Sequence, residues 1–299
     1  MRIVRHPPTR AALVALAVGL LVLALKLAAA WRTGSLTLLS DALESVVNVV
    51  AAAVAVLAVG IAARPADDNH PFGHAKVEYL SAGLEGALVM VAAVTIAWQA
   101  LERFGREPRI PELGLGLAIS GVATVLNALL AVYLLRSGRR HHSPALLTDA
   151  LHVQSDVWTS VGAYAGFGVA WATGVWELDA LVAMGVAGHI LFAGLGALRS
   201  SVGGLMDEGL SSAEVGAIAA ILAAEGPPVI EHHDLRTRRA GKHLFVELHL
   251  VVAGATTVEA AHAICDRIES SIGELHPVAH VTIHVEPEGE ARGGDRPPT

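Results

Sequence analysis

The sequence contains little charge and almost no cysteine. Charged residues make up 16% of its 299 residues, whereas a typical soluble domain has about 25%. Hydrophobic residues make up 53%, which excludes an ordinary soluble globule and also a disordered chain, because disorder requires low hydrophobicity. The single cysteine, Cys265, cannot form a disulfide within the chain and is typical of a reducing compartment.

Basic charge is scarce in the last third of the chain. Residues 201–299 contain 7 Lys/Arg and 15 Asp/Glu, whereas residues 1–200 contain 14 and 13. Eight of the 15 histidines also lie in the last third. The net charge of −7 argues against a nucleic-acid partner, because nucleic-acid binding selects for basic surfaces. The chain therefore divides into an apolar, nearly neutral body and an acidic, histidine-rich C-terminal part.

Long apolar runs are abundant. A helix needs about 20 mostly apolar residues to cross a bilayer, and six stretches are long enough. They are expected at residues 11–31, 36–63, 79–101, 113–135, 145–173 and 176–198. A cleaved signal peptide is the alternative for the first stretch, but that run exceeds a signal-peptide core of roughly 7–15 residues. The sequence predicts an N-terminal arm over 1–10 and a six-helix membrane domain over 11–200.

The distribution of lysine and arginine predicts the orientation of these spans. Six spans place both termini on one side, and that side carries nine lysine or arginine residues against four on the other. Because cytoplasmic loops are enriched in both residue types, we expect a multi-pass protein of the cell membrane with cytoplasmic termini. Four tryptophans then fall at the outer interface with lipid, where tryptophan is enriched. They are Trp31, Trp98, Trp171 and Trp176.

The residues after 200 follow the pattern of a small folded domain. Helices are expected at residues 211–224 and 257–275, and strands at 229–236, 243–251 and 280–286. This order predicts a cytoplasmic α+β domain of ferredoxin-like type over 207–288, with a disordered tail over 289–299. The predicted fold class is therefore an α-helical membrane protein with six transmembrane helices followed by a small α+β domain.

The second and fifth spans contain the same polar phrase, in which Asp-Ala-Leu is followed by polar residues at equal spacing. The matching residues are Asp41 and Asp149, Glu44 and His152, and Asn48 and Asp156. By the orientation above, the two spans cross the membrane in opposite directions, so the repeated segments are antiparallel. Internal repeats of this kind are typical of transporters.

Four members of this repeat are candidate metal ligands: Glu44, Asn48, His152 and Asp156. Each pair is spaced i, i+4 and so lies on one helix face, near the middle of the bilayer. One imidazole nitrogen and three oxygens suit Zn²⁺ or a similar divalent ion. The alternative is a hydrogen-bond cluster that joins the helices, which three ionisable groups make costly. Asp41 and Asp149 lie one turn away. Two roles are open for them: outer partners of this site, or hydrogen bonds to neighbouring helices.

The loop after the second span is a second candidate site. Asp67, His70 and His74 fall within eight residues, close enough to chelate one ion, whereas a polar loop with stray histidines is the alternative. A His-Glu-x-x-His motif is absent from the sequence, which argues against an intramembrane metalloprotease. A nucleophile–base motif is absent as well, so we expect no enzyme activity.

The C-terminal domain holds a third candidate group, drawn from three strands and a helix. Its members are His233, His249, His262, His284 and Glu286. His249 and His284 lie on strands that are expected to pair. Surface histidines of an acidic domain are the alternative interpretation.

These residues resemble the cation diffusion facilitator family over roughly residues 10–288, and within it the ferrous-iron/zinc efflux pumps of bacteria. The resemblance is strongest at residues 65–76, 152–156 and 233–238. It implies a homodimeric exchanger that moves Zn²⁺, or Fe²⁺, Mn²⁺, Co²⁺ or Cd²⁺, out of the cytoplasm against protons. It also implies a transport site at the repeat, a metal site in the loop, and a C-terminal metal cluster that braces the dimer. Lys76 and Asp207 match a charge pair of the family between its two domains.

The second span departs from the family pattern. The iron/zinc members carry two aspartates there and the zinc members His and Asp, where this chain has Glu44 and Asn48. Asparagine brings no charge, so the ionised site carries two negative charges where the iron/zinc members carry three. A metal-binding sensor or scaffold without transport is the alternative function, and a passive channel is another. Proton counterflow in liposomes distinguishes both from an exchanger.

Overall fold

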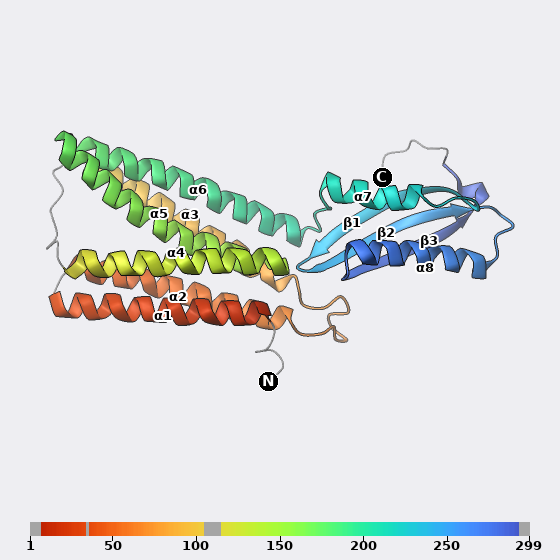
Figure 1. Ribbon diagram of the computed structural model, residues 1–299, viewed down its shortest axis with the longest axis horizontal. Coiled ribbons are helices and arrows are strands. Elements are labelled where there is room, and N and C mark those ends of the chain that lie inside the picture. The colour runs from red at the N-terminus through yellow and green to blue at the C-terminus, as the bar shows by residue number, and fades with distance from the viewer. Residues whose placement is uncertain (1–6, 34–35, 105–114, 293–299) are drawn as a thin grey trace. The chain divides into compact units, whose positions relative to one another are not determined.

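The computed structural model describes residues 7–33, 36–104 and 115–292 (Figure 1). A few side chains within these ranges, among them those of Asp41 and Glu44, also lie outside the description. The chain divides into two compact units, Met1–Val202 and Gly203–Thr299. Each unit has buried hydrophobic clusters of its own.

The described residues up to the end of the first unit contain six long helices, of which the last continues to Leu205 (Figure 1). They are α1 (Pro7–Thr33), α2 (Leu36–Ala62), α3 (Val77–Arg103), α4 (Leu115–His141), α5 (Pro144–Thr173) and α6 (Glu177–Leu205). Among the described residues, all of them except α5 include a stretch long and apolar enough to cross a membrane. The 30-residue α5 is as long as the others, but Asp149, His152 and Asp156 lower its hydropathy. The helices confirm the predicted α-helical membrane domain.

Local sequence determines where α5 begins and ends. The Oγ of Ser143 accepts a hydrogen bond from the N–H of Leu146, and Pro144 occupies the first turn, where its missing N–H is not needed. Ser143 also donates to the carboxylate of Glu78 near the start of α3. The helix ends at Gly174, whose φ of +70° favours glycine. The contact with α3 positions α5 along its axis, and α5 carries half of the polar repeat.

Small residues allow the helices of the first unit to pack closely. Ala12 of α1 is buried in one cluster with Leu134 of α4 and Leu146 of α5. A Cβ added to Gly86 of α3 would lie 3.2 Å from the backbone nitrogen of Leu198 in α6, so any larger residue here would force the two helices slightly apart. Close approach through small residues is how helices associate in lipid, where little hydrophobic force drives them together.

The second unit contains the predicted mixed domain. After α6 come α7 (Ser212–Ala223), β1 (Val229–Ala240), β2 (His243–Val252), α8 (Val258–Leu275), β3 (Ala279–Pro287) and a short 3₁₀ turn, Glu288–Glu290. The order confirms the predicted fold class. Strand β1 runs to Ala240 instead of 236, because the turn to β2 takes only Gly241 and Lys242, with Gly241 at a φ of +56°. Residues 293–299 of the predicted tail lie outside the described residues.

The three strands form one sheet in the order β1-β2-β3, with β1 antiparallel and β3 parallel to β2. Alternate residues of β2, from Leu244 to Val252, form the core with α7 and α8. Because side chains alternate across a strand, the intervening residues of β2 lie on the opposite face. His233 and His284 pair with His249 in the register, so the strand histidines of the third candidate group share that face.

Replacing Ile268 by alanine tests the core of the second unit. Ile268 of α8 is fully buried in this cluster, so the cavity left behind should lower the free energy of unfolding of the unit by about 2–5 kcal/mol. Hydrogen exchange of the β2 amides in the full chain measures the change. Val258→Ala, at an 87% exposed position of the same helix, should change it by less than about 0.5 kcal/mol. Equal protection in both variants would contradict this core.

Candidate metal sites

The polar residues of α2 and α5 meet inside the first unit. The Nε2 of His152 lies 2.7 Å from the Oδ1 of Asn48. The Nδ2 of Asn48 donates to the Oδ2 of Asp156 at 2.5 Å. Three of the four predicted ligands are therefore in direct contact. The side chain of Glu44 lies outside the described residues, and its backbone is one helical turn before Asn48 in α2.

A small cavity joins these three residues to polar neighbours on three helices. Ser45 of α2, Asn127 of α4 and Asp149 of α5 line it as well, with apolar residues of α1 beside them. The sequence suggested no role for Ser45 or Asn127. The sequence shows that Asn127 is a polar residue within an apolar span. The direction in which its side chain points depends on how α4 packs against the other helices. The cavity is accordingly a polar pocket within an apolar helix bundle.

Asp149 lines this cavity and is buried, with 2% of its surface exposed. Its Oδ2 and the Oε2 of Glu85 in α3 have no hydrogen-bond partner among the residues that the structure describes. The other oxygen of Glu85 accepts a hydrogen bond from Ser81 at 3.0 Å. Asp149 is thus beside the ligand cluster without a hydrogen bond to it, and the side chain of Asp41 lies outside the description.

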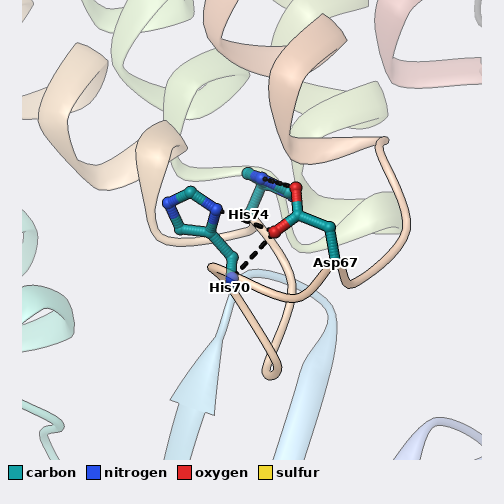
Figure 2. Close-up of side chains that lie close together, drawn as sticks. All are labelled: Asp67, His70 and His74. Atoms are coloured by element: carbon teal, nitrogen blue, oxygen red, sulfur yellow. Dashed lines mark hydrogen bonds and ion pairs between the residues drawn. The ribbon is translucent and has the colours of Figure 1, made fainter.

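The loop between α2 and α3 brings its three predicted ligands together. The Oδ1 of Asp67 lies 3.0 Å from the Nδ1 of His70, and its Oδ2 lies 3.3 Å from the Nε2 of His74. Figure 2 shows the Asp67 carboxylate facing both histidines. One ligand atom from each residue lies within 4.8 Å of the others, so a single ion can contact all three.

Contacts within the loop favour the ionised form of the Asp67 carboxyl. Desolvation raises the pKa of this carboxyl, but hydrogen bonds from the ring and the backbone N–H of His70 outweigh it and hold the pKa below its usual value. Asp67 therefore stays ionised at neutral pH. Gly73, with a φ of +81°, allows the chain to turn back between the two histidines.

The C-terminal candidate group gathers on the sheet face opposite the helices. The Oε1 of Glu286 in β3 lies 2.8 Å from the Nδ1 of His249 in β2, and its Oε2 lies 3.2 Å from the Nε2 of His233 in β1. His284 is more exposed, with its Nε2 3.8 Å from the Oε1 of Glu286. Four of the five predicted residues are thus neighbours, and we call His233, His249, His284 and Glu286 the sheet cluster.

Two atoms of the sheet cluster have the spacing of metal ligands. The Nε2 of His233 and the Oε2 of Glu286 are buried, and neither has a hydrogen-bond partner among the described residues, although they lie 3.2 Å apart. Two ligands on a tetrahedral ion with bonds of 2.0–2.1 Å are separated by about 3.3 Å. These two atoms therefore have the separation that a shared ion requires, and the residues present fit Zn²⁺.

His262 does not join the sheet cluster within one chain. It lies on α8, which packs on the other face of the sheet, and its Nε2 lies 3.8 Å from Asp266.

Asp234 is a residue that the sequence did not predict. Its carboxylate lies close enough to His233 and His249 to share an ion with them. Its position next to His233 in the strand was the available signal, but alternation predicts the opposite face, and a φ of +51° at Asp234 breaks that alternation.

The predicted charge pair has one member in each unit. Lys76 precedes α3 in the first unit. Asp207 belongs to the second unit, where its Oδ1 lies 3.2 Å from the Nη1 of Arg238. That contact joins the segment after α6 to strand β1.

Each unit matches a known domain family. Residues 12–206 match the cation efflux transmembrane domain, and residues 210–288 match the cytoplasmic domain of cation efflux proteins, a dimerisation domain. Similar solved structures include the metal-bound C-terminal domain of the CzcD transporter from Thermotoga maritima. It is 31% identical and covers 28% of this chain and 100% of that one, with a TM-score of 0.25.

Several proteins are similar over nearly their whole length. The uncharacterised transporter sll1263 of Synechocystis sp. is 41% identical over 287 residues, 96% of this chain and 92% of that protein. The cation-efflux pumps FieF of Escherichia coli and Pectobacterium carotovorum are 32% and 33% identical over 279 and 282 residues, 93% of this chain and 92% of each relative. With both domain matches, these similarities show that the chain is a multi-pass membrane protein of the cation diffusion facilitator family of metal-cation efflux transporters.

Proposed function

We propose that this chain exports a divalent transition-metal ion, with Zn²⁺ as the preferred cargo, from the cytoplasm in exchange for protons. The observation that carries the proposal is the contact of Asn48 in α2 with His152 and Asp156 in α5. An imidazole nitrogen with carboxylate and amide oxygens suits Zn²⁺, and Fe²⁺, Mn²⁺, Co²⁺ and Cd²⁺ are the alternative cargoes. The relatives named as cation-efflux pumps support the outward direction.

The hydrogen bonds of Asn48 define what cargo binding changes. An amide oxygen only accepts, so its contact with His152 requires the proton on Nε2. A histidine must offer a bare nitrogen to a metal, and binding at Nε2 therefore displaces that proton. Breaking the two hydrogen bonds also releases the amide oxygen of Asn48, which can then turn toward the ion. Glu44, one turn earlier in α2, supplies the fourth ligand of the proposed site.

Protons and cargo then compete for the same groups. In the inward-open state the ion binds from the cytoplasm and displaces protons. In the outward-open state, protons bind His152 and the carboxylates of Glu44 and Asp156, and the ion leaves. Histidine, with an ordinary pKa of about 6.5, is suited to exchange near neutral pH.

The second unit would regulate this cycle. The excess of lysine and arginine on the N-terminal side supports cytoplasmic termini, so the sheet cluster would sample cytoplasmic metal. Because α8 holds His262 away from the cluster of its own chain, we propose that it reaches the cluster of a second copy. An ion bound there supplies a link between the two chains. Lys76 and Asp207 are the proposed charge pair between the units, and an exposed ion pair is generally worth about 0–1 kcal/mol.

Substituting Asp156 tests the transport site. Asp156→Ala removes a charged ligand and should reduce Zn²⁺ uptake into proteoliposomes to background while the protein still assembles. Gln154→Ala changes an exposed residue of the same helix and should leave uptake unchanged. Undiminished uptake by Asp156→Ala would refute the site, and wild-type uptake without proton counterflow would refute the exchange.

Substituting Asn48 tests the role of its neutral side chain. Asn48→Asp adds a third carboxylate, so more protons should be displaced for each ion. The preference should also move toward ions that favour oxygen ligands, such as Mn²⁺ and Fe²⁺. Competition uptake with Zn²⁺, Fe²⁺, Mn²⁺ and Co²⁺ measures the shift. Asn48→Leu removes both hydrogen bonds without adding charge and should lower uptake of every ion. An unchanged order of preference in Asn48→Asp would contradict a ligand role.

The loop site has a matched control in its own sequence. Asp67→Asn removes the charge that faces both loop histidines, so the full chain should bind one Zn²⁺ fewer in equilibrium dialysis. Asp68→Asn makes the same change at the next residue and should leave the number of bound ions unchanged. The same count in both variants would show that the loop holds no ion.

A further inference from the structure

A separate pair of histidines lies at the far end of the sheet from the sheet cluster. His243 begins β2, and His280 is the second residue of β3. His249, the cluster member on β2, follows six residues later, which is about 20 Å at a rise of roughly 3.3 Å per residue. The pair therefore cannot share an ion with the sheet cluster of its own chain.

The nitrogens of this pair have the spacing of two ligands on one ion. The Nδ1 of His243 lies 3.3 Å from the Nε2 of His280. That separation is long for a hydrogen bond from a nitrogen, which is most often about 2.9–3.0 Å. It matches the separation of about 3.3 Å between two nitrogens on a tetrahedral ion with bonds of 2.0–2.1 Å.

Aromatic contacts hold the His280 ring in place. It stacks on Phe245, with centroids 5.0 Å apart and an angle of 17° between the planes. The guanidinium of Arg238 lies 4.1 Å from the centroid of Phe245 and so orients that ring in turn. His243 stacks on His280 at 5.5 Å. Because the rings are already ordered, binding a ligand loses less side-chain freedom than it would at mobile histidines.

The donor set determines which ligands fit. Two imidazoles favour Zn²⁺, Co²⁺ or Ni²⁺ over Mg²⁺ and Ca²⁺, which require oxygen ligands. His280 is exposed, so water can complete the coordination. Lys242 is the neighbour of His243 and repels a cation, so the affinity should be lower than at the sheet cluster, where Glu286 contributes a negative charge.

We propose that His243 and His280 form an additional site for a divalent transition-metal ion on the second unit, separate from the sheet cluster. The site does not depend on the transport proposal, because it binds at equilibrium whether or not the chain moves ions. It gives the sheet two positions of different affinity, so the second unit responds to metal over a wider concentration range than one site allows.

Equilibrium dialysis of the full chain in detergent, with Zn²⁺ as the probe and excess Mg²⁺ present, tests the proposal. The double variant His243→Gln/His280→Gln should bind one Zn²⁺ fewer than the wild type. Each single variant should weaken that ion by about 10- to 100-fold or more, since loss of a supporting residue alone has this effect. His232→Gln removes a β1 histidine outside both groups and should change nothing.

The ions that the double variant still binds show whether its second unit is folded. If the double variant loses one ion and the sheet cluster keeps its own, the sheet is intact and the site is established. The proposal is overturned if the double variant binds as many ions as the wild type, with equal affinity. It is also overturned if the sheet cluster loses its ion together with the pair, or if His232→Gln has the same effect.

Discussion

The junction of α2 with α5 depends on one amide group, that of Asn48. It donates to Asp156 and accepts from His152, so it joins α2 to α5 within an apolar helix bundle. A buried polar group left without a partner costs about 1–3 kcal/mol. Three other helices contact this junction. Helix α3 positions the start of α5 through Glu78 and Ser143, and α1 and α4 line the cavity.

Much of this architecture was accessible from the sequence, because it is encoded locally. Apolar length predicts the membrane helices, and alternation predicts the strands. The i, i+4 spacing places Asn48 on one helix face, and the repeated phrase pairs its helix with the one that carries His152. The strand boundary at Ala240 was missed because the end of β1 depends on pairing with β2 across a two-residue turn, which no local pattern determines.

The parts that were not predicted depend on packing between elements. The sequence shows that Asn127 is polar, but only the position of α4 brings it to the cavity. His262 belongs to the predicted C-terminal group with the strand histidines, and the layering of α8 on the opposite sheet face separates it from them in one chain. No motif of the sequence links His243 with His280, which are far apart along the chain. Parallel pairing of β2 with β3 makes them neighbours.

The alternation of β2 has a consequence for the turnover of the protein. The apolar residues of β2 that pack against α7 and α8 alternate with the residues proposed to bind metal, so one strand register serves both. A ligand that binds only the folded domain stabilises it in proportion to the logarithm of its concentration. If the domain binds metal as proposed, the fraction of chains that opens locally to proteases should fall as the metal concentration rises. Metal scarcity would then shorten the lifetime of the exporter that the cell no longer needs.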